Sequence, residues 1–392
     1  MSPKLHMQPY DAAIVGVAES DEIGRVPGKS NMQLGAEAAK NALADAGIAK
    51  SEVDAVFTCG IGNGLQMQEF LGIHPRYMDN TNVGGSSWVI DVEHAMAAIH
   101  AGLIDVALIV HGEHGYSARN LPDGYEDFGG RAFYPVGQFT SPFGIGAAPS
   151  SYAMAASRHM AQYGTTHEQL AEVAVATRKW AGMNPKAAKR DPISIDDVLN
   201  SPWIAYPFHL LDCCLVTDAA GAVIVASPEK AKSLAKKPAW VIGTGEWATH
   251  ADILDMPDYT VTPAKQSGAQ AFAMAGVTHK DIDLAMIYDS FTYTVIVTLE
   301  SLGFCKPGEG GAFVSGQRTA PGGEFPMNTN GGGLSYTHPG MYGIFTMIEA
   351  VRQLRGECGE RQLAKCDIAL CNGTGGALSS TGTIILTTND KG

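Results

Sequence analysis

The feature that most constrains the fold of this chain is an internal repeat. The segment AGIAKSEVDAVF, residues 46–57, returns as AGVTHKDIDLAM, residues 275–286. In both copies an Ala-Gly pair is followed, in the same register, by an acidic residue, an aliphatic residue and an aspartate, Asp54 or Asp283. Each copy is typical of a helix end, a turn and the start of a strand. A chain that uses one such unit twice is predicted to fold into two related halves.

Further pairs of segments keep the same order in the two halves. They are an aliphatic strand (AIVG, 13–16, and WVIG, 240–243), an alanine-rich helix (31–46 and 263–275), and a helix that leads into a strand (86–101 with DVALIV, 105–110; the run after His338 with DIALCN, 367–372). The repeated unit is therefore strand–helix–strand–helix–strand. Alternation of this kind predicts an α/β fold with mixed, largely parallel sheets covered by helices.

A different region, residues 115–211, separates the two halves and is expected to contact substrate, because binding groups concentrate on loops held by a rigid scaffold. It contains aromatic, glycine-rich loops and two predicted helices, at about 150–163 and 166–181. Its aromatic side chains suit either a bulky apolar ligand or an interface with a second copy of the chain: Tyr116, Tyr125, Phe128, Phe133, Tyr134, Phe139 and Phe143. We expect a first half in 1–114, this insertion, completion of the first half in 212–235, and a second half in 236–392.

Composition and charge exclude several classes of function. A chain of 392 residues with 45% apolar residues and a net charge of −13 is expected to be globular and not to have nucleic acid as its main partner. The N-terminal residues lack an apolar signal core, and no apolar run has the length of a membrane span. Seven cysteines without paired spacing predict free thiols in a reducing cytoplasm and no metal site built from this chain.

The stretch most informative about function is NTNGGGLSYTHPGMYG, residues 328–343. Its three consecutive glycines allow the backbone to pass where a side chain would clash. Pro339 is tolerated in the first turn of a helix, so we predict that a helix starts here and ends near Gly356. His338 would then lie at the helix N-terminus, where the dipole favours negative charge that develops during a reaction. We interpret His338 as a functional residue.

Together these features resemble the thiolase superfamily. The resemblance rests on the duplication, the segments YGTTHEQLAEVAVATRKWAGMNP (163–185) and LLDCCLVTDAAGA (210–222), the NTNGGG run and the His-Pro pair, and it covers nearly the whole chain. The most similar branch is that of the sterol-carrier-protein-type thiolases and their lipid-transfer-protein relatives. The resemblance implies a duplicated thiolase fold with a five-layered αβαβα core, an inserted loop domain that binds coenzyme A, and a homodimer.

The sequence departs from this family where the family keeps its nucleophile. The nucleophilic cysteine stands at the N-terminus of a buried helix, and the matching segment DNTNVGGSSWVIDVEHA (79–95) has Val83 there, directly after Asn82. No cysteine lies between Cys59 and Cys213, so no shift of the alignment recovers one. An acyl-enzyme at this position is not expected, because valine has nothing to acylate.

The remaining motifs are changed in a consistent way. The family's His-Asp-Cys-Phe motif, whose cysteine is an acid and base, reads Tyr288-Asp289-Ser290-Phe291. The Gly-His-Pro motif keeps its histidine, as Thr337-His338-Pro339, and is followed by Gly340-Met341-Tyr342-Gly343. The last motif reads Cys371-Asn372-Gly373-Thr374-Gly375-Gly376. Cysteines are lost and tyrosines are gained around one retained histidine.

A thiolase pocket without its cysteine still suits the stabilisation of a thioester enolate. A carbon–carbon bond breaks to that enolate when a β-hydroxyl is deprotonated, which is a retro-aldol reaction. The chain is similar to the superfamily's aldolases that remove side chains from steroid thioesters. We predict that Tyr293 or Tyr342 removes the proton, and that His338, with Tyr288 as a second donor, stabilises the enolate oxygen.

Other residues of these motifs are expected to support the site or to bind substrate: Ser290, Asp289, Val83, Asn82, Gly332, Gly333, Cys371 and Asn372. Coenzyme A enters as part of the acyl-CoA substrate, and no tightly bound cofactor is expected. The resemblance to the aldolases also implies a hetero-oligomer with a small OB-fold, zinc-ribbon partner, which would hold any zinc.

Two other hypotheses remain open at this stage. One is a degradative thiolase in which a displaced cysteine, such as Cys371, takes the acyl group; it predicts an acylated cysteine by mass spectrometry. The other is a non-catalytic subunit that binds acyl-CoA or lipid; it predicts stoichiometric binding without release of an aldehyde or ketone.

Overall fold

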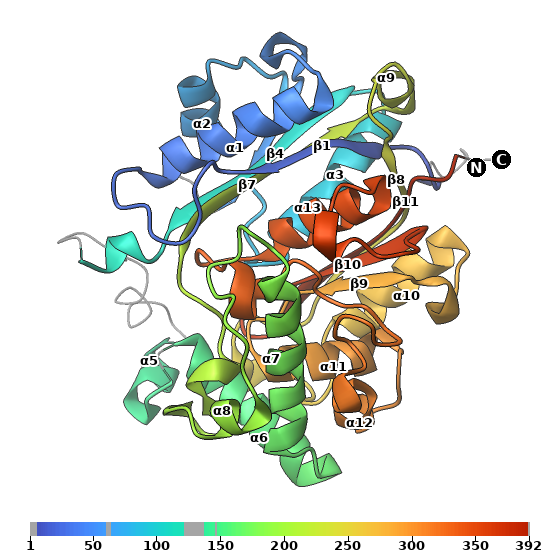
Figure 1. The fold of residues 1–392 in the computed structure, drawn as a ribbon. Coiled ribbons are helices and arrows are strands. Elements are labelled where there is room, and N and C mark those ends of the chain that lie inside the picture. The colour runs from blue at the N-terminus through green and yellow to red at the C-terminus, as the bar shows by residue number, and fades with distance from the viewer. Residues whose placement is uncertain (1–5, 60–63, 121–136, 146, 391–392) are drawn as a thin grey trace.

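The computed structural model describes residues 6–59, 64–120, 137–145 and 147–390. Within these residues, nine strands pair in the order β3-β2-β4-β7-β1-β8-β11-β10-β9 (Figure 1). Their bounds are β1 (Ala13–Glu19), β2 (Ala55–Thr58), β3 (Tyr77–Asp79), β4 (Val106–His114), β7 (Asp218–Ala226), β8 (Ala239–Ala248), β9 (Leu284–Ile287), β10 (Ile368–Gly375) and β11 (Ser380–Thr387). A separate hairpin pairs β5 (Trp203–Ala205) with β6 (Phe208–His209).

The strand order confirms the duplication. The first half runs β2-β4-β7-β1, and the second half repeats it in mirror order as β8-β11-β10-β9. The two halves join where β1 pairs with β8, through Ala13 opposite Trp240 and Ile14 opposite Ala239. Strand β3 extends the first half beyond β2, and in the second half a bridge between Ala285 and Met327 occupies the equivalent place beside β9. The sequence repeat is therefore a structural repeat.

The expectation of largely parallel sheets is wrong. Only β2 with β3, β2 with β4, and β9 with β10 pair in parallel in the described residues, whereas the other neighbours are antiparallel. The reason lies in the last strand of each unit. After β10 the chain returns directly beside the same strand as β11, and after β4 it passes through the inserted lobe and then returns beside β4 as β7, so in neither place does a helix covering the sheet carry the chain over to a parallel neighbour. Crossover helices enforce parallel pairing, and a return without one gives antiparallel pairing.

Helices cover the strands in layers. Their bounds are α1 (Asn31–Ala46), α2 (Gly64–Leu71), α3 (Ser87–His100), α5 (Gly137–Thr140), α6 (Ala148–Tyr163), α7 (His167–Gly182), α8 (Ile195–Leu199), α9 (Pro228–Lys232), α10 (Ala264–Ala275), α11 (Thr292–Leu302), α12 (Gly310–Val314) and α13 (Gly343–Arg355). Helix α1 covers β1, β4 and β7 from outside, and α10 covers β8 and β11. Helices α3 and α13 contact each other and strands of both halves, so they form the middle of five layers.

The middle layer follows from the sequence of α3, SWVIDVEHAMAAIH. Apolar residues occupy all sides of this helix rather than one stripe, which is the pattern of a helix buried all round. Trp88, Val92, Ala95 and Met96 are fully buried. Its partner α13 begins at Gly343, ends at Arg355 and is capped by Gly356, as predicted for its C-terminus.

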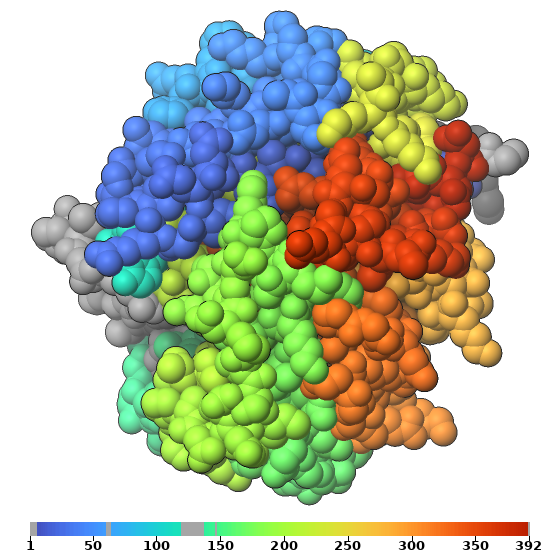
Figure 2. Space-filling view, viewed as in Figure 1, coloured from blue at the N-terminus to red at the C-terminus, as the bar shows by residue number. Residues whose placement is uncertain are grey.

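The region between β4 and β7 forms a lobe below both halves. Figure 2 shows its green residues packed against the orange residues of the second half, in agreement with contacts of α7 with α11 and α12. Among its aromatic residues, Phe139 and Phe143 are 68% and 83% exposed and Tyr116 is partly buried. Tyr125, Phe128, Phe133 and Tyr134 lie outside the described residues.

No helix of the described ranges has both the length and the apolar character needed to cross a bilayer.

Candidate active site

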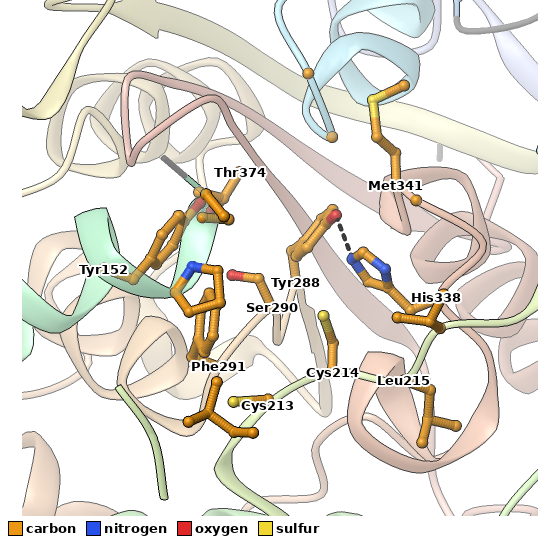
Figure 3. A pocket seen from close by; sticks show the side chains of 18 of the residues that line it. Tyr152, Cys213, Cys214, Leu215, Tyr288, Ser290, Phe291, His338, Met341 and Thr374 are labelled. Carbon is orange, nitrogen blue, oxygen red and sulfur yellow. Dashed lines mark hydrogen bonds between the residues drawn. The ribbon is translucent and has the colours of Figure 1, made fainter. Parts of the chain in front are cut away.

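A cavity of about 430 Å³ opens at the N-terminal end of α3 (Figure 3). Its walls come from the turn before α3, the ends of β9 and β10, the segment before α13, helix α6, strand β5 and the segment that follows β6. The lining residues are Gly84, Gly85, Ala147, Ala148, Pro149, Tyr152, Ile204, Leu210, Cys213, Cys214, Leu215, Val216, Tyr288, Ser290, Phe291, His338, Gly340, Met341, Thr374 and Gly376. Apolar side chains dominate, and a few polar groups converge, as in small-molecule sites.

The central polar feature of the cavity is a hydrogen bond between Tyr288 and His338. The phenol oxygen of Tyr288 lies 2.8 Å from Nε2 of His338, as the dashed line in Figure 3 marks. The backbone N–H of Tyr342 donates to the same phenol oxygen over 3.1 Å. The tautomer of His338 decides the direction of the bond between the two side chains: when the proton of the neutral imidazole is on Nδ1, Nε2 accepts from the Tyr288 O–H. We assign this tautomer, in which Tyr288 donates to a neutral imidazole.

The electrostatics of the pair agree with this proton position. Burial lowers the pKa of His338 to about 4, so the imidazole is neutral at pH 7. Burial raises the pKa of Tyr288 well above its ordinary value, with a smaller effect from Cys214. A free tyrosinate is therefore not the resting state. The phenol acts as a base only if its proton moves to His338 in the same step.

Gly85 makes room for the Tyr288 ring at the head of α3. A Cβ atom at this position would lie 2.2 Å from Cε2 of Tyr288 and 2.6 Å from the Thr374 carbonyl oxygen. Real Cβ atoms do not approach other atoms so closely, so a side chain here would displace the ring or the strand end. The glycine before α3 and the tyrosine after β9 are thus fitted to each other.

Val83 lies just outside the cavity wall. Its N–H donates to Oγ of Ser87 over 3.0 Å, and its carbonyl accepts from Oγ of Ser380 over 2.8 Å. Neighbouring Asn82 accepts hydrogen bonds from Sγ of Cys59 and from the N–H of Gly84, each over 3.4 Å. These bonds fix the turn before α3, and the side chain of Val83 itself has no group that could take an acyl chain.

Two thiols that sequence reasoning did not select line the cavity. Cys213 and Cys214 follow the hairpin β5–β6, and in Figure 3 the sulfur of Cys214 points toward Tyr288 and His338. Burial, with a smaller effect from Asp212, raises the pKa of Cys213 to about 12, and burial also raises that of Cys214. Both therefore remain thiols at pH 7, which are poor nucleophiles. In the sequence, the two adjacent cysteines of LLDCCLVTD were the pattern that could have indicated these thiols as site residues.

Cys371, the sequence candidate for a displaced nucleophile, does not line the cavity. It is fully buried on β10, and its Sγ donates to the Thr346 carbonyl over 3.6 Å. Its side chain packs toward α13, because strand residues alternate between the two faces of the sheet. The next residue, Asn372, accepts the backbone N–H of Tyr288 at 3.0 Å and so positions the tyrosine.

The two tyrosines predicted as bases lie behind the cavity wall. The hydroxyl of Tyr293 donates to the Tyr259 carbonyl over 3.0 Å, and that of Tyr342 donates to Oδ1 of Asn330 over 2.8 Å. Both side chains are fully buried, and neither lines the cavity. Each hydroxyl is therefore hydrogen-bonded within the protein rather than directed into the cavity, and the role of either tyrosine as the base stays a prediction. Proximity to a motif in sequence did not determine which way each side chain points.

His338 does not lie at the helix N-terminus, contrary to expectation. Helix α13 begins at Gly343, and a π-helical turn at Gly332–Tyr336 precedes the histidine. The histidine is instead held by its backbone N–H, which donates to Oγ1 of Thr217 over 2.9 Å. Pro339 belongs to the connecting segment, so the dipole of α13 does not act directly on this imidazole.

Asp289 explains the run of glycines. Its carboxylate accepts the backbone N–H of Gly333 at 2.6 Å and that of Leu334 at 3.2 Å. Gly332 has a positive φ of 60°, and a Cβ there would lie 2.0 Å from an oxygen of Asp289. Burial raises the pKa of Asp289 to about 7 despite these donors. The next residue, Ser290, lines the cavity and exchanges a 2.8 Å hydrogen bond with Thr294.

Sequence comparisons point to one family. The family described as thiolase C-terminal domain-like matches residues 245–388. The chain is 33% identical over 391 residues to the steroid side-chain-cleaving aldolase of Thermomonospora curvata, covering 94% of this chain and 96% of the relative. It is 35% identical over 364 residues to 17-hydroxy-3-oxo-4-pregnene-20-carboxyl-CoA lyase of Mycobacterium tuberculosis, covering 88% and 92%.

Solved structures agree with the sequence relatives. The structure of the Ltp2-ChsH2(DUF35) aldolase matches with a TM-score of 0.89 at 30% identity, over 98% of this chain and 100% of that chain. Human mitochondrial 3-ketoacyl-CoA thiolase matches with a TM-score of 0.70 at 16% identity, over 97% and 99%, which shows the fold alone. The chain therefore belongs to the thiolase superfamily, in the sterol-carrier-protein-type branch that includes the steroid side-chain-cleaving aldolases.

Proposed function

We propose that this chain is a retro-aldol lyase that breaks a carbon–carbon bond in a β-hydroxyacyl-CoA thioester. The observation that carries the proposal is the Tyr288–His338 pair, which lines the cavity together with Gly84 and Gly85. Next to these glycines stands Val83, where the family resemblance implies a nucleophilic cysteine. The relatives at 33% and 35% identity, named as an aldolase and as a CoA lyase, support the same reaction class.

The chemistry follows from the proton positions in the pair. Tyr288 accepts the proton of the substrate β-hydroxyl while its own proton moves to Nε2 of His338. The electron pair of the O–H bond forms the new carbonyl, the Cα–Cβ bond breaks, and its electrons become the thioester enolate. The ketone or aldehyde leaves, and the proton held by His338 is available for the enolate carbon. General acid–base assistance of this kind typically contributes about 10²–10⁴-fold in rate.

Tyr342 supports this step through its backbone rather than its hydroxyl. Its N–H points at the phenol oxygen of Tyr288, where negative charge develops as the proton leaves. A fixed donor at such a position stabilises the transition state without reorganisation. The hydroxyl of Tyr342 anchors the residue to Asn330.

The acyl group is proposed to be bulky and apolar, with a steroid-derived side chain as the main candidate. Phe291, Leu215 and Met341 line the cavity, and Ile204 and Leu210 at its wall are 47% and 49% exposed. An apolar group that covers them would gain about 25 cal/mol for each Å² removed from water. The substrates in the names of the two relatives agree with such a group.

The test is an assay with a β-hydroxyacyl-CoA that carries a tertiary alcohol. Lysis gives one ketone and one shortened acyl-CoA per substrate consumed, and it needs no free coenzyme A. Ketone release in equal amount to the shortened thioester supports the proposal. Turnover that requires free coenzyme A would contradict it, because thiolysis consumes one coenzyme A for each bond broken.

Acyl transfer is the second candidate, and Cys213 and Cys214 are the observation in its favour. A relative named as an acetyl-CoA acetyltransferase, from Methanothermobacter thermautotrophicus, is 30% identical over 377 residues, covering 93% of this chain and 96% of the relative. This candidate places the acyl group on a cavity thiol and not on Cys371. It predicts that replacing both cysteines by serine abolishes turnover.

We also propose that the chain works in the cytoplasm as a homodimer with coenzyme A only as part of its substrate, and that it pairs with a small OB-fold, zinc-ribbon protein. The structure matched at a TM-score of 0.89 is of an aldolase whose name includes a DUF35 component, which supports such a partner. Purification of the tagged chain from its native cells, with mass and stoichiometry of the complex, tests both assemblies.

A further inference from the structure

A cluster of potential metal ligands lies beside α3, away from the residues that line the cavity. Asp79 is the last residue of β3, and Asp91 and His94 lie one turn apart on α3, so they face the same side of that helix. Carboxylate oxygens of the two aspartates and a ring nitrogen of the histidine lie within 4.8 Å of one another. Cysteine spacing in the sequence gave no sign of it, because the ligands are two carboxylates and an imidazole.

Asp91 is the observation that points to a missing ligand. Its side chain is 0% exposed, and neither carboxylate oxygen has a hydrogen-bond partner within the described ranges. Burial of a carboxylate without a partner is costly, and protein interiors normally avoid it by pairing or by metal coordination. The carboxylate of Asp91 therefore lies near Asp79 and His94 without a hydrogen bond that would compensate for its burial.

His94 is already oriented as a metal-binding histidine. Its Nδ1 lies 3.2 Å from Asp79, and its Nε2 lies 3.3 Å from Glu246 on β8. Metal-bound histidines commonly donate their second ring N–H to a carboxylate, which fixes the ring and leaves the other nitrogen for the ion. Glu246 supplies that carboxylate, and Nδ1 faces Asp79 at 3.2 Å and Oγ1 of Thr81 at 3.5 Å.

Charge and access also favour a cation. The cluster holds two carboxyl groups beside one imidazole, and a divalent ion would take the place of a proton on the buried Asp91 carboxyl. The side chains of Asp79 and His94 are 24% and 30% exposed, so an ion reaches the site from solvent. Ligand atoms about 2.1 Å from an ion are roughly 3.4 Å apart in a tetrahedron, which small side-chain rotations achieve here.

We propose that Asp79, Asp91 and His94 bind one divalent metal ion, with Glu246 orienting the histidine. Two carboxylates and one imidazole suit Zn²⁺ or Mn²⁺. The ion would tie β3 and β8 to α3, whose N-terminal turn carries Gly84 and Gly85 of the cavity wall. This proposal differs from the expectation of no metal site in the chain, which stays untested, and it does not depend on the proposed lyase reaction.

The test is metal binding by the full chain after removal of metals with a chelator. Mn²⁺ is followed by electron paramagnetic resonance and Zn²⁺ by calorimetry, and we expect one ion per chain with a raised melting temperature. Asp91→Asn should weaken binding more than about 100-fold, and Glu246→Gln, outside the coordination shell, about 10–100-fold. Glu360→Gln, an exposed carboxylate elsewhere, is the matched control and should bind as the native chain does.

Three outcomes would overturn the proposal. The first is that the native chain shows no saturable binding up to about 1 mM metal. The second is that Asp91→Asn binds the metal as tightly as the native chain does. The third is that added metal raises the melting temperature of both proteins equally. Circular dichroism checks that each variant is folded. If Asp91→Asn does not fold, His94→Gln at the more exposed ligand replaces it, with the same expected loss of binding.

Discussion

The two buried helices of the middle layer, α3 and α13, reach the same cavity but bring different chemistry to it. The turn before α3 contributes Gly84 and Gly85, and the side chain beside them, Val83, has no polar atom. The segment before α13 contributes His338, which is hydrogen-bonded to Tyr288 from the end of β9. The first half supplies shape to this end of the cavity, and the second half supplies its acid–base groups.

This difference shows how a duplicated fold changes its reaction while it keeps its architecture. The strand order of one half is repeated in mirror order in the other, so both copies of the unit keep the same arrangement. The turn before α3 has Val83, and the Tyr288 ring fills the space beside Gly85. In the proposed reaction, the cavity holds a thioester beside the hydrogen-bonded Tyr288 and His338. Such a pocket favours enolate chemistry without a covalent intermediate.

The largest effect is expected from Tyr288→Phe. Removal of the hydroxyl that faces the substrate should lower kcat by about 10²–10⁴-fold, because the relay loses its first member. Steady-state kinetics of the purified variant measure the change. Tyr293→Phe is the matched control: its hydroxyl bonds the Tyr259 carbonyl behind the wall, so its turnover should stay within about threefold, as the buried hydroxyl acts on stability rather than on substrate.

Tyr342→Phe separates the two possible bases. The exchange keeps the backbone N–H that supports Tyr288 and removes only the bond to Asn330, so we expect a smaller loss of turnover than in Tyr288→Phe. A loss in Tyr342→Phe that equals or exceeds that of Tyr288→Phe would move the base to Tyr342 and contradict the proposed relay.

Gly85→Ala should lower turnover by about 10²-fold. The added Cβ would overlap the Tyr288 ring, and a displacement of about 1 Å near the reacting atoms costs this much in rate. Gly28→Ala is the control, because no atom lies within 4 Å of its added Cβ. Equal kinetics of the two variants would show that the ring position beside α3 has no part in the reaction.

The pH dependence should lack a histidine inflection near neutrality. The neutral imidazole is the acceptor, and with a pKa of about 4 for His338, kcat/KM should change by less than about twofold between pH 7.5 and 5.5 and fall only toward pH 4. The free energy of unfolding also declines as the pH falls from about 6.5 toward 4. The reason is that the imidazole of His338 binds a proton in this range in the unfolded chain but not in the folded chain. Circular dichroism at each pH therefore accompanies the rates. Because the pKa of Asp289 is about 7, an inflection near 6.5 contradicts a buried neutral acceptor if it persists in Asp289→Asn.

The smallest effect is expected from replacement of Cys213 and Cys214 by serine. Both thiols line the cavity but carry no proposed step, so turnover should stay within about threefold. Serine is close to cysteine in size but is more polar and lacks the thiol, so circular dichroism checks that the variant keeps its fold. Abolished turnover in the double variant would favour acyl transfer.

Much of the fold was predictable because the repeat fixes the order of elements. Residues 31–46 form α1 as predicted, since Ser30 and Gln33 provide a capping box and Gly47 ends the helix. The direction of β7 and β11 was not predictable from the same repeat, because the pattern of a buried strand does not reveal its direction. The absence of a cysteine before α3 was evident from the sequence alone, because it depends on residue identity and not on coordinates.

The side-chain arrangement of the site was only partly predictable. Tyr288 and His338 meet because both belong to recognised motifs at strand and helix ends, whereas Tyr293 follows Tyr288 closely in sequence but lies on a helix face turned toward Tyr259. Cys214 enters the cavity from a loop whose path depends on contacts far away in sequence. The direction in which a side chain points from a helix or loop depends on tertiary packing, and residue type alone does not determine it.

The most direct test of the central claim is intact-protein mass spectrometry during turnover of a β-hydroxyacyl-CoA. The proposed mechanism predicts that ketone and shortened acyl-CoA accumulate while the mass of the chain stays at its unmodified value throughout the reaction. An acyl adduct that forms and decays at the rate of turnover, on Cys213, Cys214 or any other residue, would contradict carbon–carbon lysis without a covalent intermediate.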